Sequence, residues 1–430
     1  PNGVRAPHLF GYVKEIDRLI RKDLENKKLY ELGDLVGWSG LEKHYESFLR
    51  GKRGTYFYEV DASGREVGSA TELKDTRPSP GGNIQTTIDL ELQVHCEKLM
   101  VNKKGVILVG EPLNGGILAA VSSPDYSPDF FTGLITESDW DDIKTNPDKP
   151  LINRYIQGKY IPGSIVKMIT QIALLKSQQF NKEGKQYCPG FYQFGDRIFG
   201  CWYTEGHGEL NVTEAMAVSC DVYFYKTVKQ LSLRDLNKTF NEFGFGKKTK
   251  IDIPNEAEGL VPDSDYMRKR YGKYGWSRGV LLNLAIGQGE LLVTPMQVLN
   301  YVNLLATKGK APNCHFVFVD NLPSNASPDY EDQIWENVHK GMRDAIISKN
   351  GTGKKADIDF KGFDLYGKTG TAENPHGDNH AWFVGWADYN NEKYSIVILL
   401  ENAGSGGAVA APIAKKVFSK LISDDDFVSR

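Results

Sequence analysis

Residues 160–175 read YIPGSIVKMITQIALL, and this stretch decides how the rest of the chain is interpreted. Pro162 and Gly163 interrupt the chain directly before an apolar helical run. We therefore expect Ser164 at the N-terminus of a helix and Lys167 one turn later on the same face. A serine hydroxyl becomes a nucleophile when a base removes its proton, and a lysine amine can be that base. Alone, this S-x-x-K pattern is also typical of a capped helix with a surface lysine.

Two further short motifs follow along the chain. Ser219-Cys220-Asp221 interrupts the apolar stretch AVSCDVYFYKTV, either as a helix cap or as a loop that presents Ser219 and Asp221 to one site. Lys368-Thr369-Gly370-Thr371 lies between the strand-like stretches FDLYG and HAWFVGWA. A strand edge there offers a cation, two hydroxyls and a backbone N–H, and Gly370 leaves room for a ligand beside the backbone. KTG by itself is also common in turns.

The sequence around these motifs predicts an α+β fold whose sheet is built from distant segments. Helical patterns follow Ser164, Thr213, Ser232 and Pro295, and strand patterns lie on either side of them. The predicted strands are Ile84–Ile88, Val106–Val109, Gly116–Val121, Ala381–Ala387 and Tyr394–Leu400. A closing helix is expected over Ala408–Ile422, and Asp89 is expected to cap a helix that starts after it.

The N-terminal part differs in composition, because it is polar, charged and rich in turn-forming residues. Apolar spacing predicts helices within Tyr12–Lys28 and Gly40–Leu49, and Gly51–Val67 reads as a hairpin around an Asp61–Gly64 turn. Prolines and glycines in Lys74–Gly82 indicate a domain boundary. We therefore predict an N-terminal domain over residues 1–80 and a second domain over residues 81–430.

Composition excludes several classes of protein. Of the 430 residues, 40% are hydrophobic and 25% charged, which is enough for large cores in two or three domains. The formal net charge of −3 argues against nucleic acid as a partner. The chain has no run of about 18 apolar residues that would predict a membrane span. It begins with Pro1, so we expect a longer protein whose N-terminal anchor has been removed.

In the order S-x-x-K, S-x-D, K-T-G-T, the three motifs together resemble those of the penicillin-binding proteins. Further stretches are similar to the same family over about residues 84–422, and residues 37–49 resemble the stalk of its class B members. Asp221 and the HAWFVGWA stretch are most similar to the elongation-type subgroup, penicillin-binding protein 2. The additional stretches are Pro124-Asp125-Tyr126 with Pro128, Asn153-Arg154, Gly287-Gln288-Gly289 and Thr294-Pro295-Met296-Gln297.

This resemblance implies a transpeptidase domain with an antiparallel sheet flanked by helices, preceded by an extended stalk. It implies a peptidoglycan D,D-transpeptidase of cell-wall elongation and cell shape, acting on stem peptides and inhibited by β-lactams. Such members face the periplasm from the bacterial inner membrane. They work with a membrane glycosyltransferase and other elongation proteins, and their chemistry needs no cofactor. The alternatives are a serine β-lactamase, a penicillin-sensing domain and a non-catalytic cell-wall scaffold.

The resemblance also implies a role for each motif residue. Ser164 is the nucleophile, Lys167 the base, Ser219 a proton relay and Asp221 a group that positions the donor peptide. Lys368, Thr369 and Thr371, around Gly370, bind the terminal carboxylate, and the N–H groups of Ser164 and Thr371 form the oxyanion hole. Many members carry Asn at the position of Asp221. A carboxylate there works against Lys167 acting as a base, so the proton path stays open.

Four metal-ligating residues lie between the first two motifs or within the second: Cys188, Cys201, His207 and Cys220. Three thiolates and an imidazole make an acceptable tetrahedral zinc site, although the spacing fits no standard zinc finger. In an extended triplet, Cys220 would face the metal while Ser219 and Asp221 face the substrate. A Cys188–Cys201 disulfide and free thiols are the alternatives. Cys96 and Cys314 are expected in the core.

Overall fold

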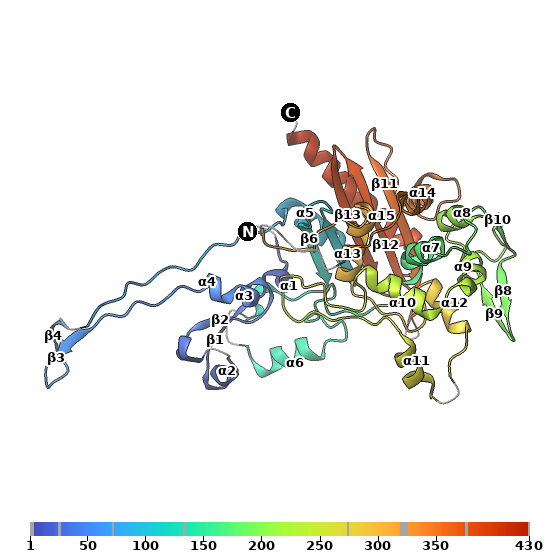
Figure 1. Cartoon of the computed structure of the whole chain (residues 1–430). Coiled ribbons are helices and arrows are strands. Elements are labelled where there is room, and N and C mark those ends of the chain that lie inside the picture. Colours follow the sequence, from blue (N-terminus) through green and yellow to red (C-terminus); the bar gives the residue numbers. More distant parts are fainter. Residues whose placement is uncertain are drawn as a thin grey trace.

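The computed structural model describes residues 4–24, 27–70, 73–131, 135–272, 275–318, 326–374 and 377–428. At its centre lies an antiparallel sheet with the strand order β11-β12-β13-β5-β6 (Figure 1). The strands are β5 (Gly105–Gly110), β6 (Ile117–Ser123), β11 (Asp364–Ala372), β12 (His380–Tyr389) and β13 (Glu392–Leu400). The predicted α+β class, with a sheet assembled from distant segments, is confirmed.

Helices cover both faces of this sheet, because its central strands carry apolar side chains on both sides. Ile107 and Phe383 lie on one face, in a core shared with α5 (Leu90–Leu99) and α15 (Gly406–Val428). Leu108 and Val384 lie on the other, in a larger core shared with α7 (Lys167–Leu175) and α13 (Pro295–Ala306). The S-x-x-K segment is therefore carried by the helical layer on this second face.

Further elements surround these layers. The helices are η2 (Pro128–Phe131), α6 (Glu137–Thr145), η3 (Gly163–Val166), α8 (Val212–Ala217), α9 (Asp221–Thr227), η4 (Val228–Gln230), α10 (Leu233–Glu242), α11 (Ser264–Tyr271), α12 (Gly279–Ala285), α14 (Asp332–Ile347) and η6 (Lys354–Ala356). Two small antiparallel pairs lie at one end of the domain (Figure 1). They are β7 (Gln186–Cys188) with β10 (Gly208–Leu210), and β8 (Phe191–Phe194) with β9 (Arg197–Gly200).

The N-terminal part forms an elongated stalk. A long two-stranded arm ends in the hairpin β3–β4, far from the sheet (Figure 1). The elements are α1 (Pro7–Phe10), β1 (Val13–Glu15), α2 (Arg18–Asp23), η1 (Lys27–Leu29), β2 (Leu35–Gly37), α3 (Gly40–His44), α4 (Glu46–Leu49), β3 (Tyr58–Val60) and β4 (Glu66–Ser69). Ala6 and Leu9 are buried in the larger core of the main domain. The predicted extended stalk is confirmed, whereas the division at residue 80 stays a prediction.

One helix prediction was wrong in part. Among the described residues of Tyr12–Lys28, Val13–Glu15 forms strand β1 and the α-helix is limited to Arg18–Asp23. Asp17 separates the two, because its carboxylate accepts the N–H groups of Leu19 and Ile20 and so caps the helix at that point. The capping role predicted for Asp89 is confirmed, since its side chain accepts the N–H of Leu92.

The sheet places K-T-G-T on its edge strand. Lys368 pairs with Val384 and Thr371 pairs with Ala381, so β11 hydrogen bonds only to β12 within the sheet. The η3 turn packs against the other side of β11. This arrangement brings the first and third motifs together across the strand edge.

Candidate active site and metal cluster

The nucleophile motif begins with a 3₁₀ turn. Ser164 lies in η3 and is half-buried, and α7 begins at Lys167, which is fully buried. Gly163 takes φ +59°, and its N–H donates to the carbonyl of Gly287 at 2.9 Å. The structure therefore agrees with a helix start at this motif, with a tighter first turn than the sequence predicts.

The Lys167 amine points into the second motif. Its Nζ donates to Asp221 Oδ1 at 2.8 Å, to the Ser219 carbonyl at 2.8 Å and to Ser219 Oγ at 3.2 Å. The Lys167 side chain is 0% exposed and that of Asp221 only 11%. An isolated buried charge is costly, so this carboxylate is what allows a lysine to sit here.

The second motif is a turn and not the extended triplet that the sequence suggests. Ser219 has φ +56°, Cys220 is the N-cap of α9, and Asp221 is the first residue of that helix. The N–H of Cys220 donates to the Ala215 carbonyl at 2.9 Å, which continues α8 into the turn. The left-handed residue, rather than strand alternation, turns Ser219 and Asp221 toward Lys167 while Cys220 points elsewhere.

Lys368 reaches the same serine from the sheet. Its Nζ donates to Ser219 Oγ at 2.7 Å and to the Thr369 carbonyl at 2.9 Å. Burial, with the nearby Lys167 charge, holds the pKa of Lys368 well below its ordinary value, and Asp221 opposes this only in part. Ser219 Oγ thus lies between two lysine amines.

The remaining K-T-G-T residues form the strand edge. Thr369 Oγ1 donates to Thr352 Oγ1 at 2.9 Å, and the Thr371 carbonyl accepts the Gln288 side-chain amide at 3.2 Å. A Cβ on Gly370 would lie 2.8 Å from Ile165 Cγ2. The room that we expected Gly370 to leave for a ligand is therefore occupied by the nucleophile turn, which needs this close approach.

Two residues at this site were not predicted from the sequence. Trp202 donates its backbone N–H to Asp221 Oδ2 at 3.1 Å and its indole N–H to the Val218 carbonyl at 3.0 Å. Gln288 contacts Thr371 as described above. Adjacent sequence features could have pointed to both residues, because Trp202 directly follows Cys201 of the predicted metal cluster and Gln288 lies within the G-Q-G triplet.

The four residues of the predicted metal cluster lie together. Their ligand atoms are all within 4.8 Å of one another, and three of the four residues are buried. Cys188 ends β7, Cys201 follows β9, His207 precedes β10, and Cys220 caps α9. The two small sheets therefore bring distant residues to one point beside the S-x-D turn.

The donor set fits a tetrahedral ion. With bonds of about 2.3 Å to sulfur and about 2.0 Å to nitrogen, zinc needs sulfur–nitrogen separations of about 3.6 Å. His207 Nδ1 lies 3.7 Å from Cys188 Sγ and 3.5 Å from Cys201 Sγ. The cysteines in the described residues form no disulfide. Cys96 and Cys314 are buried in the cores, as predicted.

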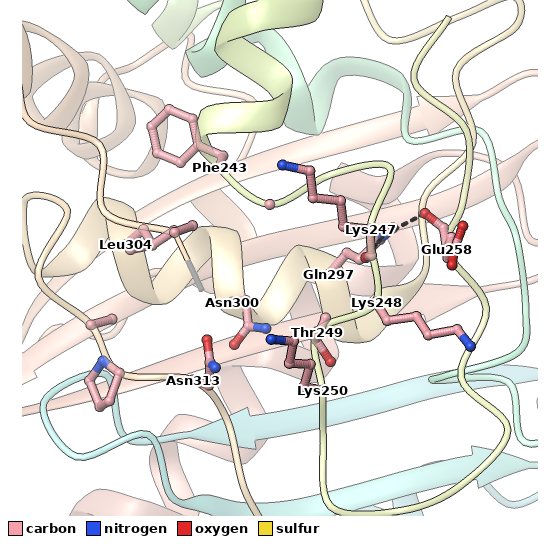
Figure 2. A pocket seen from close by; sticks show the side chains of 14 residues that line it. Phe243, Lys247, Lys248, Thr249, Lys250, Glu258, Gln297, Asn300, Leu304 and Asn313 are labelled. Carbon is pink, nitrogen blue, oxygen red and sulfur yellow. Dashed lines mark hydrogen bonds between the residues drawn. The ribbon is translucent and has the colours of Figure 1, made fainter. Parts of the chain in front are cut away.

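A separate cavity of about 300 Å³ lies between the end of α10 and α13 (Figure 2). Phe243 and Leu304 line its apolar side, and the amines of Lys247 and Lys250 extend into it, as Figure 2 shows. It contains no residue of the three motifs, so we do not assign the chemistry to it.

Comparison with known sequences decides the family. A sequence model of the penicillin-binding protein transpeptidase domain matches residues 105–419, and one of the penicillin-binding protein dimerisation domain matches residues 1–86. The chain belongs to the penicillin-binding proteins. It is 31% identical over 456 residues to the peptidoglycan D,D-transpeptidase MrdA of Haemophilus influenzae, which covers 98% of this chain and 68% of that protein. Over 458 residues it is 29% identical to the Escherichia coli K12 MrdA, covering 99% and 71%.

Solved penicillin-binding proteins have the same fold. The penicillin-binding protein PBP2 of Helicobacter pylori, in complex with MreC, has a TM-score of 0.90 and 35% identity over 98% of this chain and 78% of that one. PBP2 of Pseudomonas aeruginosa, in complex with WCK 5153, has a TM-score of 0.84 and 31% identity, covering 97% and 88%.

These matches confirm the family, the fold and the transpeptidase class predicted from the sequence. Elongation-type penicillin-binding proteins of this kind need no cofactor for their chemistry. In the described part of the chain, no helix is both long and apolar enough to cross a lipid bilayer.

Proposed function

We propose that this chain is a peptidoglycan D,D-transpeptidase of cell-wall elongation, with Ser164 as its nucleophile. The observation that carries the proposal is the convergence of Lys167, Ser219, Asp221 and Lys368 beside the η3 turn. Ser164 Oγ attacks the carbonyl of the penultimate D-alanine and forms an ester, and the terminal D-alanine leaves as an amine. The amine of a neighbouring stem peptide then attacks this ester, forms the cross-link and releases Ser164.

We propose a proton path that starts at Ser164 and uses the hydrogen bond between Lys167 and Ser219. Lys167 takes the proton of Ser164, and Ser219 Oγ, 3.2 Å from Lys167 and 2.7 Å from Lys368, passes a proton to the leaving amine. Asp221 holds the Lys167 amine in place and helps to position the donor peptide. We propose that Lys167 acts as a base in its neutral form: its amine takes the proton of Ser164, passes a proton to Ser219 Oγ, and Ser219 gives its own proton to the leaving amine, so that Lys167 ends neutral again.

The edge strand supplies binding and charge stabilisation. We propose that Lys368, Thr369 and Thr371 bind the terminal carboxylate of the donor, with Gly370 keeping the strand close to the nucleophile. The N–H groups of Ser164 and Thr371 would bind the oxyanion, at about 3 kcal/mol of transition-state stabilisation for each donor. A β-lactam would enter the same site and acylate Ser164.

Labelling with a fluorescent penicillin tests this function. Wild-type protein is expected to form a stable adduct whose mass shift maps to one peptide containing Ser164, and Ser164→Ala to form none. Ser127→Ala, outside the three motifs, is the matched control. Rapid loss of the label would identify a β-lactamase or related hydrolase instead, and absence of labelling in the wild type would favour a scaffold.

We propose that Cys188, Cys201, His207 and Cys220 hold a structural zinc ion, supported by the donor set and its spacing. Zinc would tie the two small sheets to the S-x-D turn and would take no part in acyl transfer. Metal analysis of protein purified without added metal is expected to find about one zinc ion per chain. Cys201→Ser is expected to lose the metal and to lower both thermal stability and the acylation rate, whereas Cys314→Ser keeps the metal. A stoichiometric Cys188–Cys201 disulfide without metal would overturn the assignment.

We propose that residues 1–80 form the stalk domain and residues 81–430 the transpeptidase domain, as the two matched regions support. We also propose a location on the periplasmic side of the inner membrane and an assembly with MreC and a glycan-polymerising glycosyltransferase. The MreC complex of the Helicobacter pylori PBP2 and a solved peptidoglycan synthase complex support this assembly. Co-sedimentation of the purified chain with its MreC homologue tests it, and absence of a complex at micromolar concentration would contradict it.

A further inference from the structure

We propose that Trp202 is a positioning residue for acyl transfer, because it holds the Val218–Asp221 turn in the conformation that presents Ser219 and Asp221 to the two lysines. This inference rests on the function proposed for the site formed by the three motifs. It assigns a role to a residue outside the three motifs and outside the metal cluster.

Trp202 binds the turn at both ends. Its indole Nε1–H donates to the Val218 carbonyl at 3.0 Å, directly before Ser219, and its backbone N–H donates to Asp221 Oδ2 at 3.1 Å, directly after Cys220. Ser219 lies between these anchors with φ +56°, a left-handed conformation that residues other than glycine rarely adopt. Such a conformation persists when its surroundings enforce it, and the two Trp202 hydrogen bonds are part of those surroundings.

The turn matters because Ser219 is shared by both amines. Lys167 contacts the Ser219 carbonyl and hydroxyl, and Lys368 contacts the same hydroxyl. The Val218–Ser219 peptide that Trp202 holds sets the φ angle of Ser219, and a change in this angle would shift both the carbonyl and the hydroxyl of Ser219 relative to Lys167. Misplacement of a proton-relay group by a fraction of an ångström slows the chemical step more than it weakens substrate binding.

The Asp221 carboxylate is divided between two partners. Oδ1 accepts from Lys167 at 2.8 Å, while Oδ2 accepts the Trp202 backbone N–H. The second contact holds Oδ2 and so fixes the rotation of the carboxylate that presents Oδ1 to Lys167. Trp202 therefore defines both the position of the relay serine and the orientation of the carboxylate.

The Trp202 ring is partly buried. The residue is 57% exposed, and its ring lies 5.4 Å from that of His207 and 5.8 Å from that of Tyr203. The polar indole N–H points inward to Val218 while most of the residue stays at the surface. A phenylalanine at this position can keep much of the ring packing, whereas only the indole supplies the hydrogen bond to Val218.

Replacement of one group tests the inference. Trp202→Phe keeps an aromatic ring and the backbone N–H but removes the indole donor. The control is Trp140→Phe, the same substitution at a 39% exposed residue of helix α6. For both variants, stopped-flow acylation by a penicillin gives the first-order acylation constant and the apparent dissociation constant separately. Differential scanning fluorimetry gives Tm.

We expect the acylation constant of Trp202→Phe to fall about three- to tenfold, the effect of leaving one carbonyl without its donor. The dissociation constant and the Trp140→Phe values should stay unchanged. Trp202→His returns a ring N–H and should recover part of the lost rate. The first-order constant refers to folded, penicillin-bound molecules, so a lower Tm does not by itself reduce it.

An unchanged acylation constant in Trp202→Phe overturns the inference, whether or not Tm falls. A change confined to the dissociation constant also overturns it, because Trp202 would then contact the ligand rather than position the turn. If the wild type itself is not acylated, the proposed function fails. If the wild type and Trp202→Phe are acylated equally fast, only the role of Trp202 fails.

Discussion

Gly163→Ala is predicted to slow acylation without preventing folding, because this glycine lies where the nucleophile turn meets the edge strand. Gly163 has φ +59°, and a Cβ built on it would lie 2.7 Å from the carbonyl oxygen of Thr371. The position of a Cβ is fixed by the backbone, and the Thr371 oxygen is itself a backbone atom, so neither atom can move aside by a change of rotamer. The substitution must therefore push β11 and the η3 turn apart at the place where both proposed oxyanion donors reside.

The size of the effect follows from the geometry. Real Cβ atoms essentially never approach closer than 3.0 Å, and ordinary contact begins at 3.4 Å, so the strand must move by between about 0.3 and 0.7 Å. A misplacement of about 1 Å costs about a hundredfold in rate, and scaling the barrier linearly gives a loss between about fourfold and twenty-five-fold. The left-handed backbone adds about 1 kcal/mol of destabilisation for alanine.

Gly362→Ala is the matched control for backbone strain. Gly362 has φ +83°, and nothing lies within 4 Å of a Cβ built there. Urea unfolding should show a loss of stability in both variants from the left-handed backbone, with a further loss in Gly163→Ala from its clash, but only Gly163→Ala should show a slower first-order acylation by penicillin. Equal acylation constants for the two variants would refute the steric argument and with it the proposed juxtaposition of Ser164 and Thr371.

Two further outcomes follow from the same site. Lys368→Met should raise Tm, and the gain should be larger at about pH 7 than at about pH 10. Because burial lowers the pKa of Lys368 in the fold, the unfolded chain binds the additional proton in this range and wild-type stability rises with pH. If thermal unfolding shows that the rise in Tm of Lys368→Met is the same at both pH values, the lowered pKa of Lys368 is contradicted. Gln288→Met keeps the length of the side chain but removes its hydrogen bond to Thr371, and should slow acylation by less than about tenfold. The control is Gln193→Met in the exposed β8–β9 hairpin, which should leave the stopped-flow acylation rate unchanged. A more than hundredfold loss of the acylation rate in Gln288→Met would show that its contact with Thr371 does more than align the strand.

Much of the architecture was predictable because it depends on local patterns. Short continuous apolar runs indicated the strands around Val106 and Tyr394, and caps such as Asp89 indicated helix starts. The order of the three motifs gave the family, since each motif supplies a distinct chemical group. The four metal-ligating residues were also visible in the sequence, because few other residue types bind zinc.

The geometry of the site could not be predicted from the spacing of its residues along the sequence. The S-x-D turn was expected to be extended, but Ser219 is left-handed because α8 ends against it and Trp202 binds it from another segment. Strand alternation is a local rule, whereas a left-handed serine is stabilised only by contacts made after the chain has folded. The helix expected over residues 12–28 was likewise interrupted, because β1 pairs with a distant strand.

The sequence by itself determined which chemical groups this protein has and in which order along the chain they occur. The tertiary structure decided that Lys167 and Lys368 share one serine, that Gly370 makes room for the nucleophile turn, and that Trp202 and Gln288 take part in the site. Residue type fixes hydrogen-bonding capacity and charge, which can be read locally. Which groups form hydrogen bonds with one another depends on the distant segments that the packed sheet and helices bring within about 3 Å. No local sequence pattern encodes these long-range contacts.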